Sequence, residues 1–257
     1  MKKISLNILL FAAVVIIFNP LQQISAQSKD KKVPAIEKKT LENWMNYLAS
    51  DSMRGRRNGS PEMKTAANWI AKKFKECGLK TFPNNDGYLQ RYFIKRGKDS
   101  LAENNVVGYI EGSDPKLKNE YIVISGHFDH VGVGRPVNGD SIYNGANDNA
   151  SGTCAVIGVA KTLSLMKAKP ARTIVFAAFS GEEVGMRGSR FFTAHTGFPI
   201  ENIYLNINFE MLGYCSVLGP NRYMITGPKN TNMSEISQFD DATKIVAACF
   251  PFVPEYD

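Results

Sequence analysis

The sequence predicts an α/β fold, a three-layer αβα sandwich with a central, mostly parallel mixed sheet. Beyond Gly78, short apolar runs alternate with helical segments, which is the pattern of parallel strands joined by covering helices. The composition is that of a globular protein, with 44% hydrophobic and 21% charged residues, and it excludes collagen-like and wholly disordered chains. The 257 residues are enough for one large domain with a substantial core.

The first 26 residues have the pattern of a signal peptide. Two lysines precede an apolar run from Ile8 to Phe18, and Ala26 is a small residue at the expected cleavage point. The run is shorter than the roughly 18 residues that span a bilayer, so we expect no stable membrane anchor. The protein is then secreted or periplasmic, with a flexible leader over residues 27–34 and a folded domain over residues 35–257.

Charge and cysteine content argue against a nucleic-acid-binding protein and against a disulfide-rich one. The chain carries 31 basic and 24 acidic residues, or 29 against 24 once the two lysines of the signal peptide are removed. The basic residues are dispersed and form no long run, so we expect no nucleic-acid partner. A chain of this size folds without disulfides, and we expect four buried thiols: Cys77, Cys154, Cys215 and Cys249.

Two helices are expected before the sheet begins. Residues 36–49 place apolar side chains at helical spacing, and residues 50–60 interrupt this pattern with two glycines and three arginines. Ser60 is a helix-capping residue, Pro61 is favoured in a first helical turn, and Gly78 is a stop signal. The second helix therefore begins after Ser60 and ends before Gly78.

The remaining elements are short apolar strands, bounded by glycine, aspartate and proline turns, and longer helical segments. Strands are expected over residues 88–95, 105–111, 121–125, 172–179 and 203–209, and helices over residues 152–166, 186–194 and 231–249. Residues 250–257 read as the start of another strand.

Four segments that carry histidine or carboxylate side chains follow an expected strand or lie on a glycine-rich loop. They are residues 125–130, 144–152, 180–183 and 208–211, with His127, Asp129, Asp148, Glu182, Glu183 and Glu210. The carboxyl ends of strands form the ligand-binding crevice of open α/β sheets, so we expect these side chains to converge. One histidine with several carboxylates suits a divalent cation such as Zn²⁺, and one carboxylate can bridge two ions.

The spacing within two of the segments indicates separate roles. In an extended segment His127 and Asp129 project to the same side, so Asp129 can hydrogen-bond the imidazole and fix its tautomer. Glu182 and Glu183 are adjacent and point in different directions, which allows one to bind metal while the other faces a reacting water. His130 and His195 are left out of the expected site, as a loop neighbour and as a partner of a helix carboxyl end.

Together with the preceding Leu48-Ala49-Ser50-Asp51 and Gly59-Ser60-Pro61 stretches, the four segments resemble the secreted co-catalytic dizinc aminopeptidases. This family is related to glutamate carboxypeptidase II and glutaminyl cyclase. The resemblance runs from about residue 36 to the end of the chain and rests on the order and spacing of the segments. It implies a zinc exopeptidase-like fold, two zinc ions in the complete protein and a peptide substrate.

The resemblance also implies a role for each matched position. His127 and Glu210 hold one zinc, Asp148 bridges both ions, Glu183 holds the second, Asp129 orients His127 and Glu182 is the general base. A cis peptide bond is implied after Asp148. The expected protein is thus an exported zinc-dependent aminopeptidase that hydrolyses N-terminal peptide bonds with a metal-bridging water.

Two departures from the family's pattern affect the expected activity. This chain has Glu210 where the family usually has aspartate, and the side chain is one methylene longer. The family's last zinc ligand is a histidine beyond the final helix, and no histidine follows His195 here. We therefore expect the chain to be C-terminally incomplete, to bind at most one zinc tightly and to be weakly active or inactive as it stands.

Two alternative functions remain open at the level of sequence. A glutaminyl-peptide cyclotransferase shares the expected fold, binds one zinc and catalyses intramolecular aminolysis instead of hydrolysis. The other alternative is a non-catalytic fragment or binding domain, which the missing histidine favours. The choice between amino- and carboxypeptidase rests on the resemblance, and no feature of the sequence specifies an oligomeric state.

Overall fold

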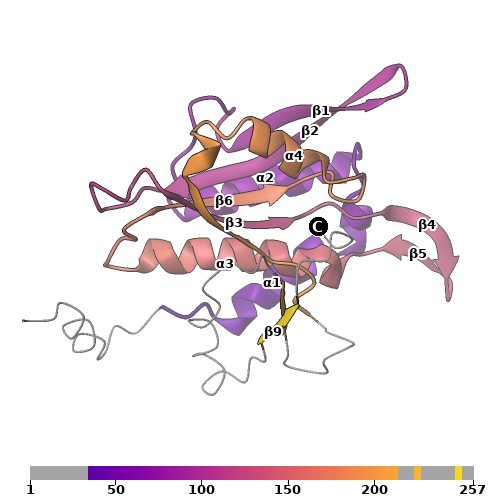
Figure 1. Ribbon diagram of the computed structural model, residues 1–257. Coiled ribbons are helices and arrows are strands. Elements are labelled where there is room, and N and C mark those ends of the chain that lie inside the picture. Colours follow the sequence, from indigo (N-terminus) through magenta and orange to yellow (C-terminus); the bar gives the residue numbers. More distant parts are fainter. Residues whose placement is uncertain (1–33, 214–222, 227–246, 251–257) are drawn as a thin grey trace, which may run out of the picture. The chain divides into compact units, whose positions relative to one another are not determined.

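The computed structural model describes residues 34–213, 223–226 and 247–250 (Figure 1). The expected signal peptide and nearly all of the expected leader lie outside these ranges. The helices are α1 (Lys38–Leu48), α2 (Pro61–Glu76), α3 (Gly152–Leu165) and α4 (Arg187–Ala194), with shorter helical turns η2 (Asp51–Arg56), η3 (Ala146–Ser151) and η4 (Ile200–Asn202). The strands are β1 (Leu89–Arg96), β2 (Asp99–Ile110), β3 (Tyr121–His127), β4 (Gly132–Val137), β5 (Asp140–Tyr143), β6 (Thr173–Phe179), β7 (Ile203–Asn208), β8 (Tyr223–Thr226) and β9 (Ala247–Phe250).

The central sheet has the strand order β1-β2-β6-β3-β7. Parallel pairing joins β6, β3 and β7, with Ile122 of β3 opposite Ile174 of β6 and Leu205 of β7. The pairs β1–β2 and β2–β6 are antiparallel. The predicted mixed sheet is therefore confirmed, and its parallel half is the half that carries the chemistry-bearing segments.

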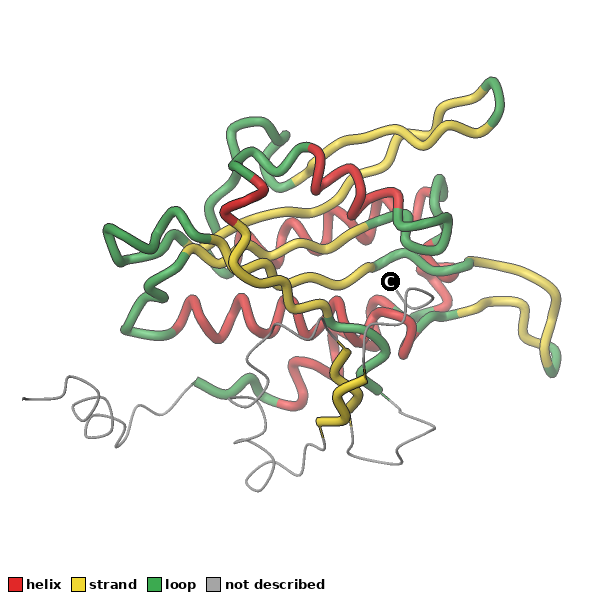
Figure 2. The backbone as a smooth tube through the Cα atoms, in the orientation of Figure 1, coloured by secondary structure: helices red, strands yellow, loops and turns green. Residues whose placement is uncertain are grey.

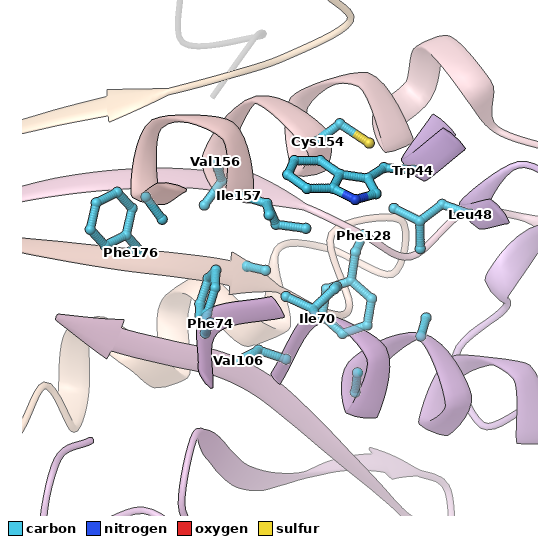
Figure 3. Close-up of a cluster of buried hydrophobic side chains, with 14 of the residues drawn as sticks. Trp44, Leu48, Ile70, Phe74, Val106, Phe128, Cys154, Val156, Ile157 and Phe176 are labelled. Carbon is cyan, nitrogen blue, oxygen red and sulfur yellow. The ribbon is translucent and has the colours of Figure 1, made fainter. Parts of the chain in front are cut away.

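Helices cover both faces of the sheet, as the αβα prediction requires. On one face α1, α2 and α3 enclose a core that includes Leu48, Phe74 and Ile157 (Figure 3). On the opposite face Phe192 of α4 packs with Val107 and Val175 of the sheet. Burial of these apolar side chains on both faces holds the sheet between its helices.

The helix expected after Ser60 begins where its capping signals place it. The Ser60 hydroxyl accepts a hydrogen bond from the Met63 amide at 3.1 Å, and Pro61 is the first helical residue. The helix ends at Glu76, and Gly78 adopts the left-handed conformation that glycine tolerates best (φ +69°).

Three strands, β2, β4 and β5, differ from the sequence-based expectation. β2 begins at Asp99 instead of residue 105, because β1 and β2 form a hairpin whose distal part is exposed and polar, so its residues lack an apolar strand pattern. The hairpin formed by β4 and β5 was not expected either. Its side chains are mostly exposed, and the sequence therefore shows no buried face.

The expected helix over residues 231–249 is wrong at its carboxyl end. Ala247 to Phe250 form β9, which pairs in parallel with β8, whereas residues 231–246 and 251–257 lie outside the described ranges. A short apolar run such as this one reads equally as a helix end or as a strand, because its periodicity is not informative.

The described residues also bear on the thiols and on membrane insertion. Cys154 is a buried free thiol, whereas Cys77 is only partly buried, because it follows the last turn of α2 near the surface. Within the described ranges, no helix combines the length and the apolar character that crossing a membrane requires.

Candidate metal centre

The candidate site lies at the carboxyl ends of the parallel strands. His127 is the last residue of β3, Glu182 and Glu183 follow β6, Glu210 follows β7, and Asp148 lies in η3 immediately before α3. The loops that follow β3 and β6 lie on the side of the sheet from which the β4–β5 hairpin projects (Figure 2). Segments that are far apart in the sequence thus meet at one edge of the sheet, as the strand order requires.

The first cluster consists of His127, Asp148 and Glu210. The Nε2 atom of His127 lies 3.2 Å from Asp148 Oδ1 and 3.2 Å from Glu210 Oε1. The side chain of His127 is only 4% exposed. Four ligands at zinc's usual bond lengths stand about 3.3 Å apart at the corners of a tetrahedron, so these separations suit an ion held by the three side chains.

The second cluster consists of His130, Asp148 and Glu183. His130 Nδ1 lies 2.9 Å from Glu183 Oε1 and 3.9 Å from Asp148 Oδ2. The donor atoms of each cluster all lie within 4.8 Å of one another. The sequence analysis missed His130 in this role, although its position three residues after His127 on the same loop could have indicated it.

Asp148 belongs to both clusters and presents a different oxygen to each. Oδ1 faces His127 and Oδ2 faces His130. The peptide bond between Asp148 and Asn149 is cis, as the resemblance implies. One carboxylate with its two oxygens aimed at two neighbouring donor sets is the arrangement of a bridging ligand.

Asp129 is fully buried and connects His127 to the loop after β6. Its Oδ1 lies 3.5 Å from His127 Nδ1, while the nearer partner of that nitrogen is the Asp129 main-chain oxygen at 3.2 Å. The two carboxylate oxygens accept hydrogen bonds from the amides of Glu182 and Glu183, each at 3.2 Å. Asp129 thus contacts the imidazole more closely through its main-chain oxygen than through the expected carboxylate, and the carboxylate fixes the backbone of the paired glutamates.

His127 is surrounded by carboxylates, which shifts its titration. Burial lowers the pKa of His127, but hydrogen bonds with Asp129, Asp148 and Glu210 outweigh it and raise the pKa to about 12. Without a metal ion, the imidazole is therefore held as a cation by the negative charge around it. A divalent cation at the same place would be attracted by the same carboxylates.

Glu182 follows β6, directly precedes Glu183 and belongs to neither cluster. Burial raises the pKa of the Glu182 carboxyl above its usual value, and the negative charges of Glu183, Asp129 and Glu210 act in the same direction, while His127 opposes them. A carboxylate with a raised pKa is a better proton acceptor near neutral pH than an ordinary glutamate.

Asn149 holds Glu210 in place, a role that sequence reasoning did not identify. Its side-chain amide donates to Glu210 Oε2 at 3.1 Å and to the Phe209 carbonyl oxygen at 2.9 Å. Its Oδ1 accepts from the amides of Gly152 and Met211. Glu210 has a side chain one methylene longer than the family's usual aspartate. Asn149 holds it through Oε2, and its Oε1 faces His127 Nε2.

The residues present fit zinc on the chemistry of their donors. Each cluster offers one imidazole nitrogen and two carboxylates, a ligand type and number found in catalytic zinc sites that keep a further position open. His127 would hold the ion through Nε2, while its Nδ1 is engaged by Asp129, and this is the usual support for a zinc-ligating histidine.

Fold and site together define a class of protein, an αβα sandwich with two histidine–carboxylate clusters that could hold metal ions near the ends of its parallel strands. The chain belongs to peptidase family M28, whose family model matches residues 105–245, more than half of the chain. The resemblance inferred from the sequence is thereby confirmed at the level of the family.

Individual relatives agree with this assignment. Leucine aminopeptidase 1 of Trichophyton equinum is 25% identical over 198 residues, which cover 74% of this chain and 48% of the relative. A probable zinc metalloprotease of Pyrenophora teres f. teres is 28% identical over 154 residues, covering 59% of this chain and 31% of the relative. The chain thus spans about half or less of the length of these curated relatives.

Solved structures share the fold. A Zn-dependent exopeptidase from Parabacteroides distasonis superposes with a TM-score of 0.64 at 17% identity, covering 86% of this chain and 79% of that chain. A zinc aminopeptidase from Bacillus subtilis gives a TM-score of 0.60 at 14% identity, covering 86% of each chain. The predicted zinc exopeptidase-like sandwich is therefore confirmed.

Proposed function

We propose that the protein is an exported zinc exopeptidase, an aminopeptidase that hydrolyses the N-terminal bond of peptides. The observation that carries the proposal is the pair of histidine–carboxylate clusters that share Asp148. Membership of peptidase family M28 supports it, and so does the similarity to a leucine aminopeptidase.

In this proposal, His127, Asp148 and Glu210 hold one zinc, and Asp148, Glu183 and His130 hold a second. Of these, His130 is added by the geometry, and the others are the ligands expected from the sequence. In the first cluster both histidine–carboxylate distances are 3.2 Å, near the spacing of tetrahedral zinc ligands, whereas in the second cluster they are 2.9 and 3.9 Å. The first ion should accordingly bind more tightly than the second.

Zinc held by these residues would polarise the scissile carbonyl and lower the pKa of a water molecule. Glu182 would accept the proton of the attacking water and deliver it to the leaving amine, since it precedes Glu183 in the chain and belongs to neither cluster. Asp129 fixes the position of Glu182 relative to His127, because its carboxylate accepts a hydrogen bond from the Glu182 amide and its main-chain oxygen contacts the imidazole.

Export is proposed from the signal-peptide pattern of residues 1–26. N-terminal sequencing of the mature protein should give a chain that begins at Gln27. A mature chain that begins at Met1 would contradict export by this route.

Hydrolysis of a panel of aminoacyl-nitroanilides, with and without added zinc, tests the proposed activity. The proposal predicts zinc-dependent release of nitroaniline from substrates with a free α-amino group, and no release when that group is acetylated. Cyclisation of N-terminal glutaminyl peptides with one zinc per chain would instead establish the cyclotransferase. Zinc binding without either activity would establish a binding domain.

A further inference from the structure

The segment between α1 and α2 contacts the two loops that carry His127 and Asp148. It lies upstream of the residues matched by the family model. Arg54, Gly55 and Arg56 all have positive φ values, of 43°, 65° and 46°. A side chain at Gly55 would collide with the carbonyl oxygens of Tyr143 and Gly132, at the base of the β4–β5 hairpin. This sparsely populated backbone conformation is maintained by close packing, and such conformations concentrate at functional sites.

The unusual backbone turns Arg56 into the interior of the protein. Its side chain is fully buried, and burial lowers the pKa of the guanidinium to about 10, so it remains a cation at neutral pH. A buried cation requires compensating partners. Arg56 finds them in four hydrogen bonds, each of which ends on a main-chain carbonyl oxygen.

Three of these carbonyls belong to the loops that carry the metal-binding side chains. Nε donates to the Phe128 oxygen at 2.7 Å, and the two terminal nitrogens donate to the oxygens of Asn144 and Gly145, each at 2.8 Å. Phe128 stands between His127 and Asp129, and Gly145 is three residues before Asp148. A single guanidinium thus joins the histidine loop to the loop of the bridging carboxylate.

Neighbouring contacts extend the same connection. The main-chain oxygen of Arg56 accepts a hydrogen bond from the His130 amide at 3.2 Å. The fourth donor bond reaches the Leu48 oxygen at the end of α1, and this anchors the guanidinium to the scaffold. The Phe128 side chain is buried in the core beside Ile70 (Figure 3), so the histidine loop is fixed by packing on one side and by Arg56 on the other.

We propose that Arg56 is a positioning residue of the metal centre, which sets the distance between the histidines and Asp148 by tying their two loops together. The inference rests on the proposed binding of zinc by these clusters. The hydrogen bonds of the Arg56 side chain all end on main-chain oxygens, so Arg56 acts through the backbone of the loops and not on a metal-binding side chain. Only arginine presents enough donors in a rigid planar fork to satisfy these carbonyls at once, because a lysine offers three donors on a flexible stem.

The test compares Arg56→Met and Arg56→Lys with Arg57→Met, a control that removes the same charge from the exposed neighbouring arginine. Zinc dissociation constants are measured by chelator competition on the full chain, well below each variant's thermal midpoint. We expect zinc to bind about 10- to 100-fold more weakly to Arg56→Met, and Arg56→Lys to fall between it and wild type. Arg57→Met should match wild type.

Activity separates positioning from general stabilisation. In both Arg56 variants, excess zinc should restore most of kcat while KM stays near the wild-type value. A folded Arg56→Met with a lowered thermal midpoint but a zinc affinity within about twofold of wild type would overturn the proposal. If Arg56→Met does not fold, Arg56→Lys is judged by the same criterion. A wild-type protein that binds no zinc would overturn the proposed function and this role together.

Discussion

The two clusters that share Asp148 differ in how their ligands are held. The histidine of the first cluster ends a central strand, and both of its ring nitrogens face partners at 3.2 Å. The histidine of the second cluster lies on the following loop, and its Nδ1 is 2.9 Å from one carboxylate and 3.9 Å from the other. The first cluster is therefore close to a metal-binding geometry, whereas the second must separate His130 from Glu183 to admit an ion.

This difference shows that a strand end and a loop place ligands by different means. The register of β3 against β6 and β7 fixes His127 through main-chain hydrogen bonds. His130 is fixed by the contact of its amide with Arg56 and by Glu183. The shared ligand couples the two clusters, so a change in one should be measurable in the other.

The largest effect is expected from Asp148→Ala, because this change removes a ligand from both clusters. Zinc content, measured by elemental analysis, should fall to near zero, and hydrolysis should be lost with it. The control is Asp140→Ala, which removes an exposed aspartate from the β4–β5 hairpin. If Asp148→Ala lost only one ion and retained the other at wild-type affinity, Asp148 would not bridge the clusters.

Glu182→Gln tests whether Glu182 accepts a proton without binding zinc. This variant should retain wild-type zinc content while its kcat falls by roughly 10²- to 10⁴-fold, because it loses a base and no ligand. Glu183→Gln, the matched change one residue along, should instead lose the second ion. Loss of zinc in Glu182→Gln with retention in Glu183→Gln would show that the two roles are reversed.

His127→Ala and His130→Ala compare the clusters directly. His127→Ala should abolish tight zinc binding, whereas His130→Ala should leave the tight ion in place and weaken the second. His195→Ala is the control, because this exposed histidine follows α4 and faces Phe191. Equal losses in His127→Ala and His130→Ala, measured by chelator competition, would remove the distinction between a preformed and a loop-held cluster.

The smallest effect concerns pH. The pKa of His127 is raised to about 12 in the folded metal-free state and is about 6.5 in the unfolded state. Its protonation therefore stabilises the metal-free fold fully below about pH 6.5, and this contribution is lost as pH rises toward 12.

Zinc must displace that proton, so its affinity for the first cluster should rise by up to about tenfold per pH unit above neutrality. Calorimetry in buffers with different ionisation enthalpies should detect release of about one proton per tight zinc. Zinc affinity that is constant between pH 7 and pH 8 would contradict the charged state of His127.

The sequence predicted those parts of the site that depend on strand ends. The apolar strands were recognisable, and the carboxyl ends of parallel strands must meet, so the convergence of His127, Glu183 and Glu210 at one edge of the sheet followed. The position of His130 three residues after His127 was a hint of a donor, but its place opposite Glu183 depends on loop conformation and could not be predicted. Arg56 was hidden for the same reason, since nothing in the local pattern shows that a positive-φ turn directs its guanidinium inward.

In the fold, too, elements with local or apolar sequence signals were predicted, whereas exposed strands were missed. The boundaries of α2 followed from Ser60 and Gly78, whose capping roles are local. The distal part of the β1–β2 hairpin and the β4–β5 hairpin were missed, because exposed strands carry no apolar alternation. The end of the expected helix over residues 231–249 was wrong, because four apolar residues do not distinguish a helix from a strand.

Zinc titration of the metal-free protein tests the central claim, that Asp148 is shared by two unequal clusters. The account predicts two ions per chain that bind in separate steps, the first more tightly, with both steps lost in Asp148→Ala and only the second lost in Glu183→Gln. A single ion per chain, lost alike in Asp148→Ala, His127→Ala and Glu183→Gln, would contradict it and establish a mononuclear centre.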